Sequence, residues 1–439
     1  MISEFYFLGG SLLIFVVLGL RSFILKFSGV FLLIFFSLYS FHLEGGKALV
    51  LIGVFAVLSL LGPKKEEQTE VPVLSLIIVF GVFCLISSTN WLSVYLAIEL
   101  STLCFFVLIA RGSGYSAEAG LKYFVLGALS SGLFLFGCAL LCGIGGNVHF
   151  AYLDLILNSK QTFSDVCPPV GYILILGALF FKLSVAPFHM WAPDVYEGAP
   201  TKIVLLLATV PKIGIFSLLI ALGLPVNSLL IGVVFSLFVG TLGALNQTKI
   251  KRLLAYSGIG HMGFILWGFE SGSFESLQAS LVYLFIYVIM TICVFSLILG
   301  FHLYKNLLIE FSGVSRLLPL FAVTLGVVLF SIAGIPPFAG FLSKWVVLLS
   351  GVLSRSYFVF LFAVFCSVIG GVYYVRVVKL LFFQKNSCLL IALKALRKEL
   401  HLNFKKVFLV GLCLYFLLFL FLAPHLGFFV TSQTIMIFF

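Results

Sequence analysis

The chain has 439 residues, of which 62% are hydrophobic and only 9% are charged. Soluble domains are usually about 25% charged, so this composition excludes a protein whose main solvent is water. The formal net charge of +11 at pH 7 is compatible with contact either with nucleic acid or with anionic lipid, and its distribution along the chain decides between them.

Long apolar runs recur from end to end, each about 20 residues long, enough to cross a bilayer as a helix. Segments such as "GSLLIFVVLG" and "LLIGVVFSLFVG" do not alternate polar and apolar residues, which excludes barrel strands. We therefore expect an all-α polytopic membrane protein with about fourteen transmembrane helices. In chain order the expected spans are 3–20, 23–41, 47–62, 71–88, 91–110, 117–145, 170–195, 200–222, 226–246, 249–269, 277–303, 317–352, 357–383 and 405–430.

Most connections between these spans are short, and the longest is the basic segment 384–406. There Leu389, Leu393, Leu396 and Leu400 share one helical face, whereas the basic side chains point elsewhere. This pattern predicts an amphipathic helix on the membrane surface. A solvated basic loop is the alternative.

Positive charges orient the expected spans. Of the 26 Lys and Arg residues, 20 lie in the loops that follow odd-numbered spans or in the span ends beside those loops. The loops after even-numbered spans hold only Lys47, Lys160 and Arg355. This bias places both termini away from the positive side and supports an even number of spans. It also attributes the net charge to topology and anionic lipid, not to nucleic-acid binding.

The sequence contains no signature of a bound cofactor. The nine cysteines lie mostly inside apolar runs, where free cysteine is a common packing residue. A phosphate loop, a dinucleotide fingerprint and a haem motif are missing from the sequence. The N-terminal "MISEFYFLGG" resembles neither a cleavable signal nor a transit peptide, so we expect the first run to be a span.

Four ionisable residues remain inside apolar runs: Glu99 in "WLSVYLAIEL", Lys182 in "ALFFKLSVAPFHMW", Lys212 in "LLLATVPKIGIFSLL" and Lys344 in "GIPPFAGFLSKWVVLL". A charged side chain at bilayer depth costs about 2.5–3.5 kcal/mol on insertion scales. Glu99 can pair with either Lys182 or Lys212, which leaves at least one lysine without a carboxylate in this chain. A proton-carrying row explains these residues better than snorkelling or a merely structural salt bridge.

His261, in "SGIGHMGF", is a weaker candidate for the same row. A neutral imidazole bonded to a neighbouring side chain explains it equally well, and the same two interpretations apply to His189.

Prolines interrupt two of the expected spans. Pro187 lies in the seventh, and Pro336 and Pro337 lie in the twelfth. Helices broken in mid-membrane mark ion pathways when their freed backbone lines a polar cavity. The two "PF" pairs are separated by five spans, an odd number, which is the pattern of an inverted repeat. The order of lysine and proline differs between the two segments, and the tenth span has no carboxylate to match Glu99.

Four stretches carry a family resemblance: "FKLSVAPFHMWAPDVYEGAPT", "VPKIGIF", "KRLLAYSGIGHMGF" and "SIAGIPPFAGFLSKW". They closely resemble chain 2 of NADH–ubiquinone oxidoreductase, the subunit N type of the complex I membrane arm. The resemblance covers about residues 71 to 383. It implies three leading helices in 1–64, two inverted five-helix repeats in 71–222 and 226–383 with broken helices 7 and 12, and a basic segment with a last helix in 384–439.

The resemblance also implies residue roles. Glu99 and Lys182 match the coupled pair, Lys212 the central relay and Lys344 the exit-side lysine of a proton-translocating subunit. FMN, iron–sulfur clusters and ubiquinone are then expected in partner subunits, with none in this chain. The partners expected are other membrane-arm subunits, including neighbouring antiporter-like ones, and membrane lipids. Asp194 and Glu197 are interpreted as stabilising the segment after the first break.

Two other functions and three compartments remain open. The runner-up function is a cation/proton antiporter subunit without redox coupling, and the third is a scaffold that only fills the membrane arm. The 51 phenylalanines suit an AT-rich organellar gene, so we expect the mitochondrial inner membrane, with a bacterial plasma membrane or a chloroplast thylakoid as alternatives.

Overall fold

The computed structural model describes residues 70–112, 114–150, 167–222, 226–269, 272–301, 306–384 and 404–436. The three expected N-terminal spans within 1–64 and nearly all of the basic segment, residues 385–403, lie outside the described residues. The described part is all-helical. Its elements are α4 (Glu70–Ile86), α5 (Trp91–Ala110), α6 (Gly114–Gly145), α8 (Cys167–Leu183), α9 (Trp191–Gly198), α10 (Thr201–Leu222), α11 (Val226–Leu245), α12 (Ile250–Gly268), α13 (Phe274–Phe301), η2 (Leu308–Phe311), α14 (Val314–Leu317), α15 (Pro319–Ala333), α16 (Ala339–Leu353), α17 (Tyr357–Phe382), α19 (Phe404–Leu422) and α20 (His425–Met436).

Five of these helices are long and apolar enough to cross a membrane: α5, α6, α10, α13 and α17. Shorter apolar helices accompany them, including α8 before the first interruption and both α15 and α16 around the second. Outward-facing positions are apolar as well, for example Phe358, Leu361, Phe365 and Val368 on α17, each at least 64% exposed. An apolar outer face is what a lipid-enclosed helix requires, so the chain is a multi-pass membrane protein.

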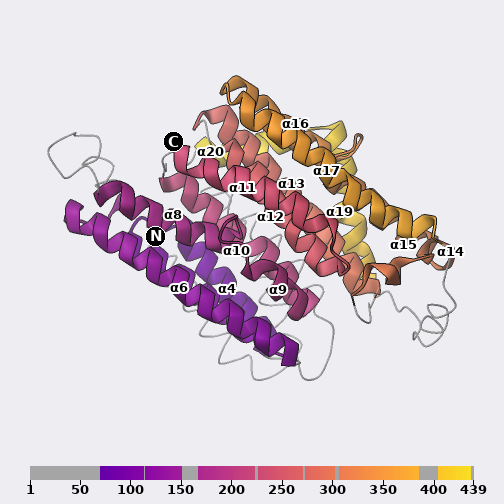
Figure 1. Cartoon of the computed structure of the whole chain (residues 1–439), viewed down its shortest axis with the longest axis horizontal. Helices are drawn as coiled ribbons and strands as arrows, with labels where there is room; N and C mark the ends of the chain where they lie inside the picture. Colours follow the sequence, from indigo (N-terminus) through magenta and orange to yellow (C-terminus); the bar gives the residue numbers. More distant parts are fainter. Residues whose placement is uncertain are drawn as a thin grey trace. The chain divides into compact units, whose positions relative to one another are not determined.

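The chain forms two compact units, of which the first comprises residues up to Ser184 together with Gly198–Ser228. In it α6 and α8 lie side by side (Figure 1), and α5 packs against both α4 and α6. Gly137 allows the close approach of α6 and α8, because a Cβ there would lie 2.8 Å from the carbonyl oxygen of Gly171. The enclosed helix of this unit is α10, which contacts α4, α5 and α8.

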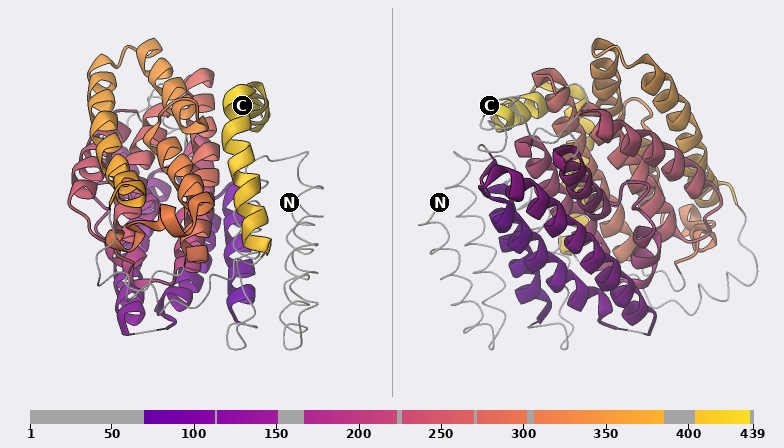
Figure 2. Two further views of the ribbon diagram at one scale, coloured as in Figure 1. Left: turned by 90° about the vertical axis from the view of Figure 1, so that its right-hand side faces the viewer. Right: turned by 60° about the vertical axis from the view of Figure 1, so that its left-hand side comes forward.

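The second unit comprises Val185–Glu197 and residues from Leu229 onward. Its enclosed helix is α13, which contacts α12, α15, α16, α19 and α20. The yellow helix α19 in Figure 2 is one of these neighbours. The backbones of α11 and α12 touch where two glycines meet, since a Cβ on Gly240 would lie 2.5 Å from the backbone nitrogen of Gly260. Small residues drive such close helix packing in membranes, and this contact holds the middle of α12 in place.

The segments expected as the seventh and twelfth spans are each two helices. Residues 184–190 separate α8 from α9, and residues 334–338 separate α15 from α16. Proline has no backbone N–H and clashes with the preceding turn, which accounts for a break at each site.

The segment expected as one last span, 405–430, is also divided, and on this point the sequence prediction was wrong. The first part, α19, ends at Leu422, and α20 begins at His425. Pro424 lies between them, and the backbone N–H of Ala423 still bonds to the carbonyl oxygen of Phe419 at 2.8 Å. The residue before a proline disfavours helical dihedrals, which explains why α19 stops there.

Candidate functional site: buried ionisable residues beside two helix breaks

Lys182 lies in the last turn of α8, in the first unit. Its Nζ is buried and, among the described residues, has no hydrogen-bond acceptor. It lies within electrostatic range of Glu99 on α5 and 5.7 Å from the centroid of the Phe181 ring. The Glu99 carboxylate accepts a long hydrogen bond, 3.4 Å, from the Thr102 hydroxyl. Glu99 and Lys182 are thus brought together as an electrostatic pair without a direct hydrogen bond.

A small cavity opens beside Lys182. The centre of a water molecule has about 10 Å³ of room in it, which is about the space of one water. The hydroxyls of Ser130 and Ser131 donate to backbone carbonyls of their own helix at 2.7 and 2.9 Å, so their oxygens are still able to accept. Residues lining the cavity include Tyr95, Ser130, Ser131, Phe134 and Lys182.

Lys212 lies near the middle of α10, directly after Pro211. The proline removes the donor that would otherwise bond to the carbonyl of Leu207. Lys212 is only 3% exposed, and α10 is buried around its whole circumference from Ile203 to Leu219, apart from Pro211. The Lys212 side chain therefore cannot extend along an outer surface of α10 towards water, because this part of α10 has no outer surface.

Lys344 lies on α16 in the second unit and reaches back across the break to α15. Gly334 caps α15 in the left-handed conformation, with φ of 85°, which favours glycine. The Lys344 Nζ donates to the carbonyl oxygen of Ala333 at 2.6 Å. It also lies 5.7 Å from the centroid of the Phe264 ring, within the range of a cation–π contact. The break thus supplies a carbonyl at the negative end of a helix, where a cation is stabilised.

His261 is buried on α12, among hydroxyls from two other helices of the second unit. Its Nδ1 lies 2.9 Å from the hydroxyl of Tyr283 on α13, and its Nε2 lies 3.5 Å from the hydroxyl of Tyr374 on α17. The ring of Tyr287 also contacts the imidazole. His189 is different, because its Nδ1 bonds to the backbone carbonyl of Pro187 at 3.2 Å within the first break.

The three prolines at the breaks differ from the lysines in their exposure. Pro187, Pro336 and Pro337 are exposed at the breaks, whereas the buried ammonium groups lie on the adjoining helices. Among the described residues, no three His, Cys, Asp or Glu side chains gather as a metal site would require.

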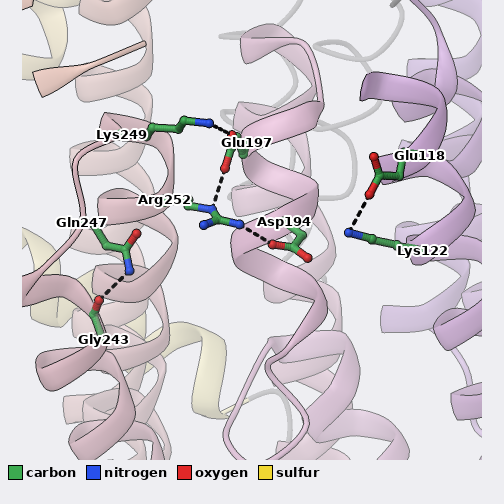
Figure 3. Close-up of polar contacts among 8 residues, drawn as sticks. All are labelled: Glu118, Lys122, Asp194, Glu197, Gly243, Gln247, Lys249 and Arg252. Atoms are coloured by element: carbon green, nitrogen blue, oxygen red, sulfur yellow. Dashed lines mark hydrogen bonds and ion pairs between the residues drawn. The ribbon is translucent and has the colours of Figure 1, made fainter. Parts of the chain in front are cut away.

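Asp194 and Glu197 lie on α9, the short helix after the first break (Figure 3). Arg252 on α12 contacts both, at 2.6 Å to Asp194 and 2.5 Å to Glu197, and Lys249 forms an ion pair with Glu197. These side chains are between 27% and 41% exposed, as suits a network at a helix end. The ion pairs fasten α9 to the start of α12, which agrees with the interpretation that the two acids stabilise this segment.

Replacing Arg252 by alanine is expected to loosen α9 and to lower the thermal stability of the second unit. The loss should be about 1 kcal/mol, because exposed ion pairs contribute about 0.2–1 kcal/mol each and Arg252 joins two acids. The measurement is the unfolding midpoint of the purified protein. Lys122→Ala is the control, since Lys122 pairs with Glu118 one turn away on the surface of α6 and should shift the midpoint less. Equal shifts would contradict an anchoring role for Arg252.

Several partners were missed by sequence reasoning. Two of them are Tyr283 and Tyr374, which contact His261 from other helices. A third is Phe264, which contacts Lys344 from another helix. No local sequence motif indicates contacts between separate helices. Tyr283 and Tyr287 are four residues apart in an apolar run, and that shared helical face was the available signal.

Comparisons with known proteins agree on a family. The family described as "NADH:quinone oxidoreductase/Mrp antiporter, TM" matches residues 88–370. NADH-ubiquinone oxidoreductase chain 2 of Metridium senile is 58% identical over 370 residues, covering 83% of this chain and 96% of that protein.

Solved structures show the same fold. A chain of respiratory complex I from Thermus thermophilus superposes with a TM-score of 0.82 and 27% identity, covering 96% of this chain and 98% of that one. A chain of the Mrp complex from Dietzia has a TM-score of 0.75 at 19% identity, covering 89% and 83%, and shows likeness of fold alone. The extent of the family match and the identity to a full-length relative together establish that this chain belongs to the chain 2 family of NADH–ubiquinone oxidoreductase.

Proposed function

We propose that the chain is a proton-translocating membrane-arm subunit of NADH:ubiquinone oxidoreductase. Protons would move through a mid-membrane chain of Lys and Glu residues, driven by quinone reduction in other subunits. The redox groups would be held by those partners, and the neighbours of this chain would be other membrane-arm subunits and lipid. A mitochondrial inner membrane is the compartment that we infer, because the relative from Metridium senile is an NADH-ubiquinone oxidoreductase chain 2.

The observation that carries this proposal is the enclosure of Lys212. An ammonium group 3% exposed on a helix with no outer surface is unfavourable by several kcal/mol unless it is used or compensated. Lys182, with its Nζ buried near Glu99, adds a second such group in the same unit. Buried ionisable residues within membrane helices are functional by default. We assign Glu99 and Lys182 as the coupled pair, Lys212 as the central relay, Lys344 as the exit-side lysine and His261 as an accessory carrier.

The order of the helices also supports an internal repeat. If each interrupted span is counted once, α4–α10 and α11–α17 each hold five spans with the fourth broken. An isolated antiparallel bridge joins Asn90, before the second span of the first set, to His149, after the third. The second set has its counterpart between Lys249 and Leu307. We propose that these sets, 71–222 and 226–383, are the inverted repeats, within about fourteen transmembrane helices in the whole chain.

Replacing Lys212 by alanine tests the proposal. We expect the complex to assemble and NADH-linked turnover to fall by about tenfold or more, because a proton-transfer group typically contributes about 10²–10⁴. Assembly is followed on native gels, and turnover as NADH oxidation with added quinone. Lys122→Ala, at an exposed surface pair, is the matched control and should keep full activity. Full activity in assembled Lys212→Ala would favour the scaffold function instead.

A vesicle experiment distinguishes the proposed function from the alternative, a cation/proton antiporter without redox coupling. The likeness to the Mrp chain supports this alternative at the level of fold. Vesicles that contain the complex should take up protons when NADH is supplied and stop when a quinone-site inhibitor is added. An antiporter would respond instead to an imposed sodium or potassium gradient with no NADH present.

A further inference from the structure

A chain of hydroxyls and one imidazole runs through the second unit beside Lys344. Tyr283 and Tyr374 contact the two different nitrogens of His261, at 2.9 and 3.5 Å. Two further hydroxyl side chains, those of Ser257 and Tyr373, lie within electrostatic range of the Tyr374 hydroxyl, and the rings of Tyr373 and Tyr374 have centroids 4.3 Å apart. The Ser257 hydroxyl donates to the carbonyl of Leu254 at 2.9 Å. The imidazole thus joins a hydroxyl on α13 to a hydroxyl on α17.

Phe264 lies between this row of hydroxyls and Lys344. It lies one turn after His261 on α12 and is 5% exposed. Its ring stacks nearly parallel on Tyr283, with centroids 5.9 Å apart and 8° between the planes. The Lys344 ammonium lies 5.7 Å from the centroid of the Phe264 ring. A phenyl ring neither donates nor accepts a proton, so Phe264 provides no hydrogen-bonded link between Lys344 and Tyr283.

We propose that Tyr283 and Tyr374 are the proton partners of His261 in a relay, and that Phe264 closes the link between this relay and Lys344. The inference rests on the proposed function and deepens it by naming residues that are not among the buried charges. It explains why His261 has a hydroxyl at each nitrogen, and why the residue one turn away is aromatic.

A single transfer moves one proton through the relay. The Tyr283 hydroxyl gives its proton to Nδ1, the Nε2 proton passes to the Tyr374 oxygen, and the Tyr374 hydroxyl releases its own proton to a water molecule beyond it. The hydroxyl of Tyr283 takes up a replacement proton from the side of Lys344 when Phe264 moves away. The imidazole is then left in its other tautomer, and the hydroxyls must rotate before the next transfer. Each proton lost by one group is gained by the next, and no bond other than N–H and O–H changes.

Tyrosine-to-phenylalanine variants test the relay, because they remove one hydroxyl and keep the ring. In vesicles that contain the assembled complex, Tyr283→Phe and Tyr374→Phe should each lower NADH-driven proton uptake by about tenfold or more. Tyr256→Phe is the control on the same helix, since the Tyr256 ring packs against Gly243, and its uptake should stay at the wild-type rate. The solvent deuterium isotope effect on uptake should rise in the two relay variants, which a merely structural role would not produce.

Variants of Phe264 test the closed link. Phe264→Ala makes space for water between Lys344 and Tyr283, and should speed the collapse of an imposed pH gradient in vesicles without NADH by about tenfold or more. Phe264→Leu keeps the space filled and should remain as tight as wild type. Phe264→Val is the intermediate variant to use if the alanine variant does not assemble.

The outcomes separate the inference from the proposed function. If Lys212→Ala impairs proton uptake but both tyrosine variants work at the wild-type rate, the relay is wrong and the proposed function stands. If Phe264→Ala and Phe264→Val are assembled and tight to protons, the closed link is wrong. If Lys212→Ala has full uptake, the proposed function itself fails, whatever the tyrosine variants do.

Discussion

Replacing Lys344 by methionine should reduce NADH-driven proton uptake by the assembled complex by about tenfold or more. Methionine keeps the length and apolar stem of the lysine but has neither the charge nor the donor. The carbonyl of Ala333, which accepts from Nζ at 2.6 Å, would lose its partner, and a proton carrier would disappear from α16. Uptake is measured in vesicles by a pH-sensitive dye, normalised to the amount of assembled complex.

Two further variants define what the lysine contributes. Lys344→Arg keeps the charge and a donor, and should restore assembly and stability while uptake remains low, because a guanidinium does not release its proton. Lys122→Met is the matched control for the substitution itself, since Lys122 is 43% exposed on α6 and pairs with Glu118 one turn away. Full proton uptake in assembled Lys344→Met would remove Lys344 from the proton path.

Replacing Gly340 by alanine is expected to disrupt the second break and to prevent stable assembly. A Cβ at this position would lie 1.8 Å from the carbonyl oxygen of Ser331, a backbone atom that cannot move without shifting α15. The start of α16 would have to withdraw, and Lys344, four residues later on the same helix, would be pulled away from Ala333. Overpacking typically destabilises by about 1–3 kcal/mol. Because the added Cβ would clash with backbone, we expect a loss of stability at the upper end of this range or above it.

The effect of Gly340→Ala is measured as the yield of assembled complex on native gels and as its thermal midpoint. Gly371→Ala is the control, because Gly371 lies inside α17 and an added Cβ there meets no heavy atom within 4 Å. Alanine is a better helix former than glycine by about 1 kcal/mol, so this control should assemble normally or better. A Gly340→Ala complex as stable as wild type would show that α15 and α16 separate easily at the break.

Much of the fold follows from the local pattern of apolar residues. Apart from the short η2 and α14, the described helices from α4 to α17 lie within a few residues of the expected spans. Each apolar run is long enough to cross a bilayer, and backbone groups in lipid must bond within their own helix. Pro187 and Pro336 identify the two interruptions for a similarly local reason. The sequence did not predict that the last span is divided into two helices. Pro424 lies near the end of that span, where a proline is as compatible with a helix terminus as with a break.

The partners of the buried residues depended on the tertiary structure. The sequence left Glu99 open to either Lys182 or Lys212, and the electrostatic interaction that the structure resolves is with Lys182. Nothing in the segment around Lys344 indicates that its ammonium would meet the carbonyl of Ala333 or the ring of Phe264. Asp194 and Glu197 were interpreted as stabilising, but their partners Lys249 and Arg252 lie more than fifty residues away.

The sequence by itself determined that this chain is a membrane protein made of helices, and that it has four ionisable residues inside apolar runs. It did so because the cost of an unbonded backbone or a bare charge in lipid depends on residue type and run length alone. Only the tertiary structure decided which hydroxyl, carbonyl or ring meets each buried group. Those contacts join helices far apart in sequence, and their geometry is set by close packing, such as that of Gly240 on Gly260, that no local pattern encodes.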